Sequence, residues 1–169
     1  MIINLNSNSS EYTKEIGKRI GSVLKGNELI LLSGDLGMGK TLFTKGLASG
    51  LGLAESEIVS PTFTLQNCYY IEKLEKNLYH FDLYRIGTGK GTGSNSKSGG
   101  LISPEIDENI KDHIVVVEWA QYLDPSYFNE SDIIHVEFTI ETDNLHHRQL
   151  KIETEEPQLI SILKGYKGF

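Results

Sequence analysis

The feature that most constrains this chain is the stretch from Gly34 to Thr41, which reads GDLGMGKT. It fits the pattern G-x-x-x-x-G-K-[ST], the phosphate-binding loop of P-loop NTPases. Glycines let such a loop curl so that several backbone N–H groups point inward at phosphate oxygens. Lys40 can then reach the β- and γ-phosphates, and the Thr41 hydroxyl can bind Mg²⁺. The stretch therefore predicts a site for a nucleoside triphosphate.

The residues on either side supply the strand and the helix that the motif requires. Residues 28–33 (ELILLS) form a short apolar run that is typical of a buried strand. Residues 40–51 place leucine and phenylalanine near helical spacing, and Gly50 and Gly52 stand where a helix would end. Helix N-termini also favour anions. This context disfavours the simpler interpretation of a glycine-rich turn with a solvated lysine.

The composition limits the classes of protein to which the chain can belong. Its 169 residues suit one domain, 1–169. The net charge of −7 argues against independent binding of DNA or RNA, so contact with RNA is expected only through a complex. No apolar run approaches a membrane span and the N-terminus lacks a signal-peptide pattern, so we expect a cytoplasmic protein. Cys68 is the only cysteine, which excludes an intrachain disulfide, and we expect it to be a small packed side chain.

Apolar periodicity predicts the remaining elements. We expect a strand over 1–5 and helices over about 10–25, 102–111 and 156–164. Alternating residues predict two hairpins, one from 65–71 with 77–84 and one from 132–141 with 148–154, the latter joined by 142–147. The glycine- and serine-rich residues 87–100 predict a mobile connection. Together these elements predict an α/β, P-loop NTPase-like three-layer fold, with parallel core strands and antiparallel hairpins in a mixed sheet.

A carboxylate ends the most apolar strand of the sequence. Residues 113–119 (HIVVVEW) predict a buried, parallel and central strand that finishes at Glu118. This is the Walker B pattern with Glu in place of the more usual Asp, and its role would be to hold Mg²⁺ directly or through water. The alternative is a strand-end acid in solvent. Trp119 has two interpretations, a core aromatic or part of a nucleotide pocket.

Two further residues are candidates for chemistry. Asp82 ends a predicted hairpin strand, and α/β proteins place ligand chemistry at such ends. It could instead be a strand-end cap with Arg85 as its surface partner. Thr62 follows Pro61 in an extended or turning segment, where switch-type NTPases sense the γ-phosphate. From spacing alone, an ordinary Ser/Thr turn is the favoured interpretation of Thr62.

Four blocks together resemble one family. In chain order they are GDLGMGKT at 34–41, SPTFTL at 60–65, HFDLYR at 80–85 and VEW at 117–119. Their order and their residues closely resemble the motifs of the TsaE (YjeE) family, the small ATPase of bacterial threonylcarbamoyladenosine synthesis on tRNA. The similarity covers most of residues 1–125. It implies an ATP-binding α/β fold with TsaD and TsaB as partners. These transfer a threonylcarbamoyl group to an adenosine beside the tRNA anticodon, and the ATPase supports their turnover.

The resemblance also implies roles for individual residues. Lys40 matches the phosphate lysine, Thr41 and Glu118 match the Mg²⁺ ligands, Asp82 matches a carboxylate needed for hydrolysis, and Thr62 matches the switch-like loop. The implied nucleotide contacts are Ser10, Asp35, Leu36, Gly37, Met38, Gly39, Lys40, Thr41, Leu42, Trp119 and Arg148.

The sequence also departs from the family pattern. Leu42 replaces a frequent Thr or Ser, Met38 replaces a usual Ala, and the glycine-rich stretch replaces or precedes an acidic, leucine-rich segment after residue 85. The last difference affects expected partner contacts more than ATP binding.

Two other functions compete with the tRNA-modification ATPase. A small-molecule P-loop kinase usually needs several arginines to hold phosphates, and this chain has three scattered ones. A GTPase switch would carry the guanine signature N-K-x-D, whereas residues 109–112 read NIKD in the wrong order. ATP with Mg²⁺ is therefore the expected cofactor.

Overall fold

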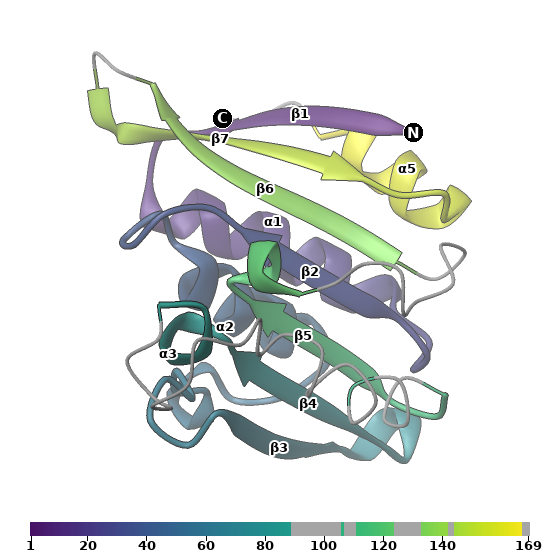
Figure 1. Ribbon diagram of the computed structural model, residues 1–169. Helices are drawn as coiled ribbons and strands as arrows, with labels where there is room; N and C mark the ends of the chain where they lie inside the picture. Colours follow the sequence, from purple (N-terminus) through teal and green to yellow (C-terminus); the bar gives the residue numbers. More distant parts are fainter. Residues whose placement is uncertain (89–105, 107–110, 124–132, 142–143, 167–169) are drawn as a thin grey trace.

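Seven strands form one mixed sheet in the computed structural model, which describes residues 1–88, 106, 111–123, 133–141 and 144–166. The strands are β1 (Ile2–Ser7), β2 (Leu29–Ser33), β3 (Gln66–Ile71), β4 (Lys76–Asp82), β5 (Ile114–Glu118), β6 (Ile133–Glu141) and β7 (Asn144–Glu153). Their order across the sheet is β1-β7-β6-β2-β5-β4-β3 (Figure 1). Strands β6, β2, β5 and β4 run parallel at the centre, and antiparallel pairing adds β3 at one edge and β7 with β1 at the other.

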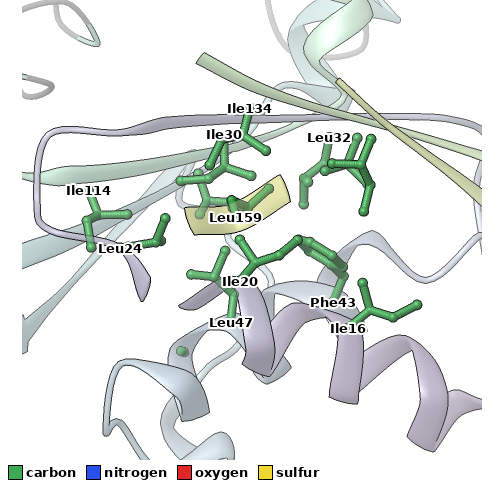
Figure 2. Close-up of a cluster of buried hydrophobic side chains, with 14 of the residues drawn as sticks. Ile16, Ile20, Leu24, Ile30, Leu32, Phe43, Leu47, Ile114, Ile134 and Leu159 are labelled. Atoms are coloured by element: carbon green, nitrogen blue, oxygen red, sulfur yellow. The ribbon is translucent and has the colours of Figure 1, made fainter. Parts of the chain in front are cut away.

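Helices cover both faces of this sheet. The helices are α1 (Ser10–Val23), α2 (Lys40–Gly50), α3 (Tyr84–Gly87) and α5 (Pro157–Lys164). Alternate residues of β2 supply two separate hydrophobic clusters, because successive side chains of a strand point to opposite faces. Ile30 and Leu32 pack with α1, α2 and α5, while Leu29 and Leu31 pack with the side that carries α3. Figure 2 shows the first cluster, in which Ile20 and Phe43 lie between the helices and the sheet. The predicted three-layer α/β fold with a mixed sheet is confirmed.

Glycines bring α1 and α2 into backbone contact. A Cβ atom added at Gly46 of α2 would lie 2.0 Å from the backbone oxygen of Lys14 in α1. One added at Gly17 of α1 would lie 2.3 Å from the backbone oxygen of Phe43 in α2. Gly21 and Gly50 make equally close approaches one turn further along. Helix α2, which begins at the glycine loop 34–39, is therefore held at a fixed distance from α1 by packing that tolerates no side chain.

Most predicted elements are present, with shifted ends. Helix α1 ends at Val23, and Ser9 is its N-cap, since the Ser9 Oγ accepts a hydrogen bond from the Tyr12 amide. Strand β4 ends at Asp82 and not at Tyr84, because the chain turns into α3 there. Strand β7 begins at Asn144, so the connection predicted over 142–147 is shorter than expected.

The mobile connection predicted over 87–100 stays a prediction. Gly87 is the last residue of α3, where a Cβ would overlap the ring of Tyr122. The rest of that stretch, residues 89–100, lies outside the described residues. So does the helix expected over 102–111, apart from a helical, buried Ile106 and the turn at 111. The prediction of a packed Cys68 is wrong, because its side chain is exposed. It lies on the opposite face of β3 from the fully buried Ile71. Among the described residues, no helix is long and apolar enough to cross a membrane.

We expect Gly46→Ala to destabilise the protein, because its methyl group would have to push α1 and α2 apart. Overpacking of this kind costs about 1–3 kcal/mol. Urea denaturation monitored by circular dichroism measures the difference. Gly165→Ala is the matched control, since a Cβ there meets no atom closer than 3.6 Å. Equal midpoints for the two variants would show that the helices can adjust freely.

Candidate functional site

The glycine loop 34–39 joins β2 to the N-terminus of α2 (Figure 1). Gly34, Gly37 and Gly39 all have positive φ angles, of 135°, 79° and 102°. A Cβ at Gly34 would lie 2.6 Å from the backbone oxygen of Phe138, whereas one at Gly37 would meet nothing within 4 Å. The loop is thus packed against the sheet at its start and open at its middle. The first amides of a helix have no partner within the helix, so this open backbone suits an anion.

Lys40 lies folded beneath this loop and is only 4% exposed. Its Nζ donates to the backbone oxygens of Gly34, at 2.7 Å, and Asp35, at 2.8 Å. The same Nζ is 3.8 Å from the centre of the Trp119 ring, which is a cation–π contact. Burial lowers the pKa of Lys40, and the carboxylates of Glu118, Asp82 and Asp35 oppose that shift. The ammonium group therefore sits at the loop with contacts that it can exchange for phosphate oxygens.

Glu118 and Thr41 meet where β5 ends beside β2. Glu118 is paired with Leu32 of β2 and is 2% exposed. Its Oε2 accepts a hydrogen bond from the Thr41 Oγ1 at 2.8 Å, and its Oε1 lies 2.8 Å from the His80 Nε2. A carboxylate and a hydroxyl oxygen are hard ligands of the kind Mg²⁺ prefers, and Mg²⁺ usually takes one or two protein carboxylates and completes its shell with water and phosphate. The donor set fits a Mg²⁺ ion.

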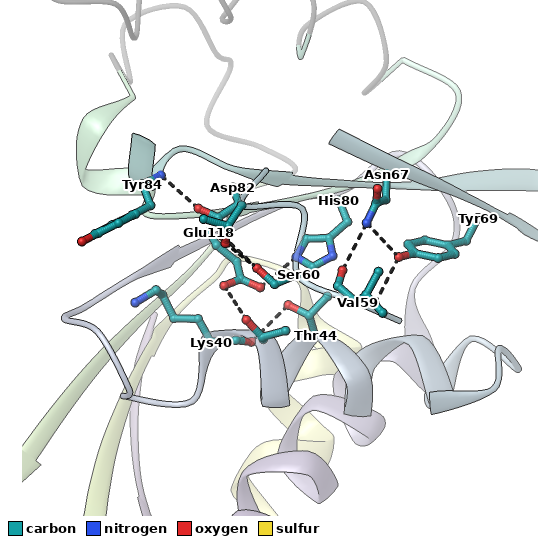
Figure 3. Close-up of polar contacts among 12 residues, drawn as sticks. Lys40, Thr44, Val59, Ser60, Asn67, Tyr69, His80, Asp82, Tyr84 and Glu118 are labelled. Carbon is teal, nitrogen blue, oxygen red and sulfur yellow. Dashed lines mark hydrogen bonds and ion pairs between the residues drawn. The ribbon is translucent and has the colours of Figure 1, made fainter. Parts of the chain in front are cut away.

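Asp82 lies next to Glu118 and holds the segment that contains Thr62. The two carboxylates are neighbours in the register of β4 and β5. The Asp82 Oδ2 accepts hydrogen bonds from the Ser60 Oγ at 3.0 Å and from the Thr62 Oγ1 at 2.5 Å. Its Oδ1 accepts from the Tyr84 amide at 2.9 Å, so Asp82 also caps the start of α3 (Figure 3). Arg85 is not its partner, because the Arg85 Nη1 donates to the backbone oxygen of Phe63.

The segment with Thr62 is anchored at its base as well. The Val59 amide donates to the Tyr69 hydroxyl at 3.3 Å, and the Asn67 side-chain amide donates to the Val59 oxygen at 3.2 Å (Figure 3). At the other end, Leu65 has a φ of 72°, a conformation that costs a non-glycine residue on the order of 1–2 kcal/mol. Residues 62–64 form a turn, and the Leu65 amide donates to the Pro61 oxygen at 2.6 Å. The turn favoured from spacing is therefore present, closed by these contacts and slightly strained at Leu65.

These groups surround one cavity of about 440 Å³, a size typical of small-molecule sites. Its lining residues are Leu36, Gly37, Gly39, Lys40, Thr41, Leu42, Ser60, Thr62, Asp82, Tyr84, Glu118, Trp119 and Arg148. Sequence reasoning did not select Ser60 and Tyr84, although both stand inside the motif blocks that carry Thr62 and Asp82.

Three of the predicted nucleotide contacts do not line the cavity. Ser10 is exposed and donates to the Glu11 carboxylate. Asp35 contributes its backbone oxygen to Lys40, and Met38 packs against the helix-side hydrophobic cluster.

Arg148 and Trp119 each contribute in a way that the sequence left open. Arg148 is on β7, and its Nε is buried without a hydrogen-bond partner among the described residues. A Cβ on Gly39 would lie 3.5 Å from that nitrogen, so the guanidinium borders the glycine loop. Trp119 is 7% exposed and belongs to the second hydrophobic cluster, yet it also lines the cavity. Both interpretations of Trp119, core aromatic and pocket wall, therefore hold.

Comparisons with known proteins agree with this geometry. The family model described as "Threonylcarbamoyl adenosine biosynthesis protein TsaE" matches residues 7–150. A Rickettsia felis protein named "tRNA threonylcarbamoyladenosine biosynthesis protein TsaE" is 28% identical over 158 residues, covering 94% of this chain and 85% of its own. A Nostoc protein of the same name is 38% identical over 125 residues, covering 70% of each chain.

A solved structure shares the fold. The crystal structure of Bacillus subtilis YdiB superposes with a TM-score of 0.67 at 25% identity, covering 99% of this chain and 97% of that one. The family match spans the glycine loop and all of the strand ends that form the cavity. The chain therefore belongs to the TsaE family of tRNA threonylcarbamoyladenosine biosynthesis proteins.

Proposed function

We propose that this protein binds and hydrolyses ATP, and that it does so as the subunit that supports turnover of a TsaD–TsaB complex making threonylcarbamoyladenosine on tRNA. One observation carries the proposal. Lys40, Thr41, Asp82 and Glu118, which come from one helix and two strands, converge on one cavity beside the glycine loop. A cytoplasmic location follows from the proposed work on tRNA, which this acidic chain would contact only through its partners.

The proposed binding mode uses groups that are already in place. Phosphate oxygens would take the open amides of the glycine loop and replace the Gly34 and Asp35 oxygens as acceptors for Lys40. The Arg148 Nε, which has no partner among the described residues, offers a further donor at the same loop. Thr41 and Glu118 would hold Mg²⁺, which when bound neutralises charge on the phosphate oxygens.

In hydrolysis, Asp82 would orient the attacking water. A carboxylate has about four acceptor positions, and the contacts from Ser60, Thr62 and Tyr84 fill three of them. Thr62 shares that carboxylate and lines the cavity, so a change at the phosphates can reach the 60–62 segment through Asp82. This is the arrangement expected of a switch-like loop.

The alternative of a small-molecule kinase finds less support. Kinases of this kind use several arginines to hold two phosphorylated substrates. Here Arg148 lines the cavity, whereas Arg19 pairs with Glu15 on α1 and Arg85 contacts the Phe63 backbone. A single bordering arginine suits hydrolysis that is slow until a partner completes the site.

We expect Lys40→Ala to abolish tight ATP binding, because this ammonium group is the cation buried at the loop. Isothermal titration calorimetry measures the affinity. Lys45→Ala is the matched control, since Lys45 lies on the same helix and does not line the cavity. Wild-type affinity in Lys40→Ala would exclude the proposed phosphate site.

Substitutions of the two carboxylates should have different effects on ATP binding and hydrolysis. We expect Glu118→Gln to lose Mg²⁺-dependent ATP affinity, because it removes a charged metal ligand. We expect Asp82→Asn to keep ATP affinity and lose hydrolysis, because a group that acts only in the transition state lowers kcat alone. Calorimetry and single-turnover hydrolysis on both variants provide the measurement. The reverse pattern would exchange the two roles.

The proposed function itself is tested with the partners. We expect weak phosphate release by the isolated protein and a rate at least roughly tenfold higher with purified TsaD–TsaB. A cationic group supplied in trans by a partner can raise the hydrolysis rate by far more than that. Lys40→Ala assayed with the same partners is the control for contaminating ATPases. Equal turnover with and without the partners would contradict the proposal, and transfer of phosphate to a small molecule would favour the kinase.

A further inference from the structure

His80 is a buried titratable residue to which the proposed function has so far given no role. It is on β4, two residues before Asp82, and its side chain is fully buried. Residues two apart on a strand point to the same face, so the imidazole lies on the side of the sheet where the carboxylates of Asp82 and Glu118 lie. Its Nε2 is 2.8 Å from the Glu118 Oε1, as Figure 3 shows.

We propose that His80 is a positioning residue that sets the orientation of the Glu118 carboxylate for Mg²⁺. The inference rests on the proposed function, since it concerns the metal-binding half of the same site. An ionised carboxylate can only accept hydrogen bonds, so the His80 Nε2 carries the hydrogen and donates it to Oε1. That contact occupies one carboxylate oxygen and leaves Oε2 directed at the Thr41 hydroxyl, 2.8 Å away.

Two contacts at different oxygens fix a side chain that has three rotatable bonds. Without the His80 contact, Glu118 would keep only the Thr41 hydrogen bond, and Thr41 is itself a proposed metal ligand. With the Thr41 hydroxyl and Oε2 both serving as ligands of a bound Mg²⁺, the hydrogen bond between those two oxygens would no longer be available to hold the carboxylate. The His80 contact does not involve either metal-facing oxygen, so it persists in both states.

A role in apolar packing alone does not account for a histidine at this position. Apart from Asp82 and Glu118, the neighbours on the same face of β4 and β5 are apolar, among them Leu78, Ile114 and Val116. The His80 Nδ1 is buried without a partner among the described residues, which costs free energy that an apolar side chain would not. The recorded polar contact of this imidazole goes to the proposed metal ligand. Groups that orient metal ligands typically change metal affinity by roughly 10–100-fold when removed.

The test compares His80→Leu, which removes the donor, with His80→Gln, whose amide nitrogen extends about as far as the imidazole Nε2. Calorimetry measures ATP affinity in EDTA and across a Mg²⁺ titration. We expect His80→Leu to raise, by roughly 10–100-fold, the Mg²⁺ concentration at which half of the gain in ATP affinity is reached. The ATP affinity in EDTA should be unchanged. His80→Gln should restore most of the Mg²⁺ effect. His113→Leu is the matched control, because that imidazole adjoins the far end of β5 and contacts the Asn77 amide.

Other outcomes separate a failure of the inference from a failure of the proposed function. A wild-type Mg²⁺ response in His80→Leu overturns the inference and leaves the proposed function standing, as does an equal loss of affinity with and without Mg²⁺ in both variants. A wild-type protein that binds no ATP overturns the proposed function and the inference with it. If His80→Leu does not fold, the comparison of His80→Gln with His80→Asn decides, since the shorter amide cannot reach Glu118 and should lose the Mg²⁺ response.

Discussion

The site depends on the buried carboxylate of Glu118 and on its two hydrogen bonds. A buried charge is stable only when its oxygens are hydrogen-bonded, and here His80 and Thr41 satisfy one oxygen each. These two bonds tie the end of β5 to β4 on one side and to the first turn of α2 on the other. The same charge also faces Lys40 and opposes the effect of burial on its pKa. A single side chain thereby sets the spacing between the sheet, the helix and the glycine loop.

Packing remote from the cavity makes that spacing reproducible. Backbone contact between α1 and α2 at four glycines leaves α2 little freedom to move relative to α1. The helix N-terminus, and with it Thr41, therefore stays within hydrogen-bonding distance of Glu118. The 60–65 segment is different in kind, because it is held by side-chain hydrogen bonds to Asp82 and ends in a strained Leu65. Helix α2 and the 60–65 segment thus meet at the neighbouring carboxylates of Glu118 and Asp82.

The sequence predicted what is local and missed what arises from pairing across the sheet. The strand, glycine loop and helix at 28–51 follow from spacing within one short stretch, and the structure places them within a residue or two. The His80–Glu118 contact joins residues 38 positions apart, and no periodicity reports which neighbouring strand a buried carboxylate will face. Arg148 borders the loop only because β7 pairs with β6, which in turn pairs with β2. Cys68 is exposed although Ile71 of the same edge strand is buried, and alternation within 65–71 did not show which face of β3 would be covered.

The most direct measurement is a crystal structure of the protein with a non-hydrolysable ATP analogue and Mg²⁺. We expect β- and γ-phosphates on the amides of the glycine loop, with Lys40 moved from the Gly34 and Asp35 oxygens to the phosphates. We also expect the metal to be held by Thr41 and Glu118, with the His80–Glu118 contact intact. A nucleotide bound elsewhere, or bound here with Lys40 still on those two backbone oxygens and no metal at Glu118, would contradict this expectation.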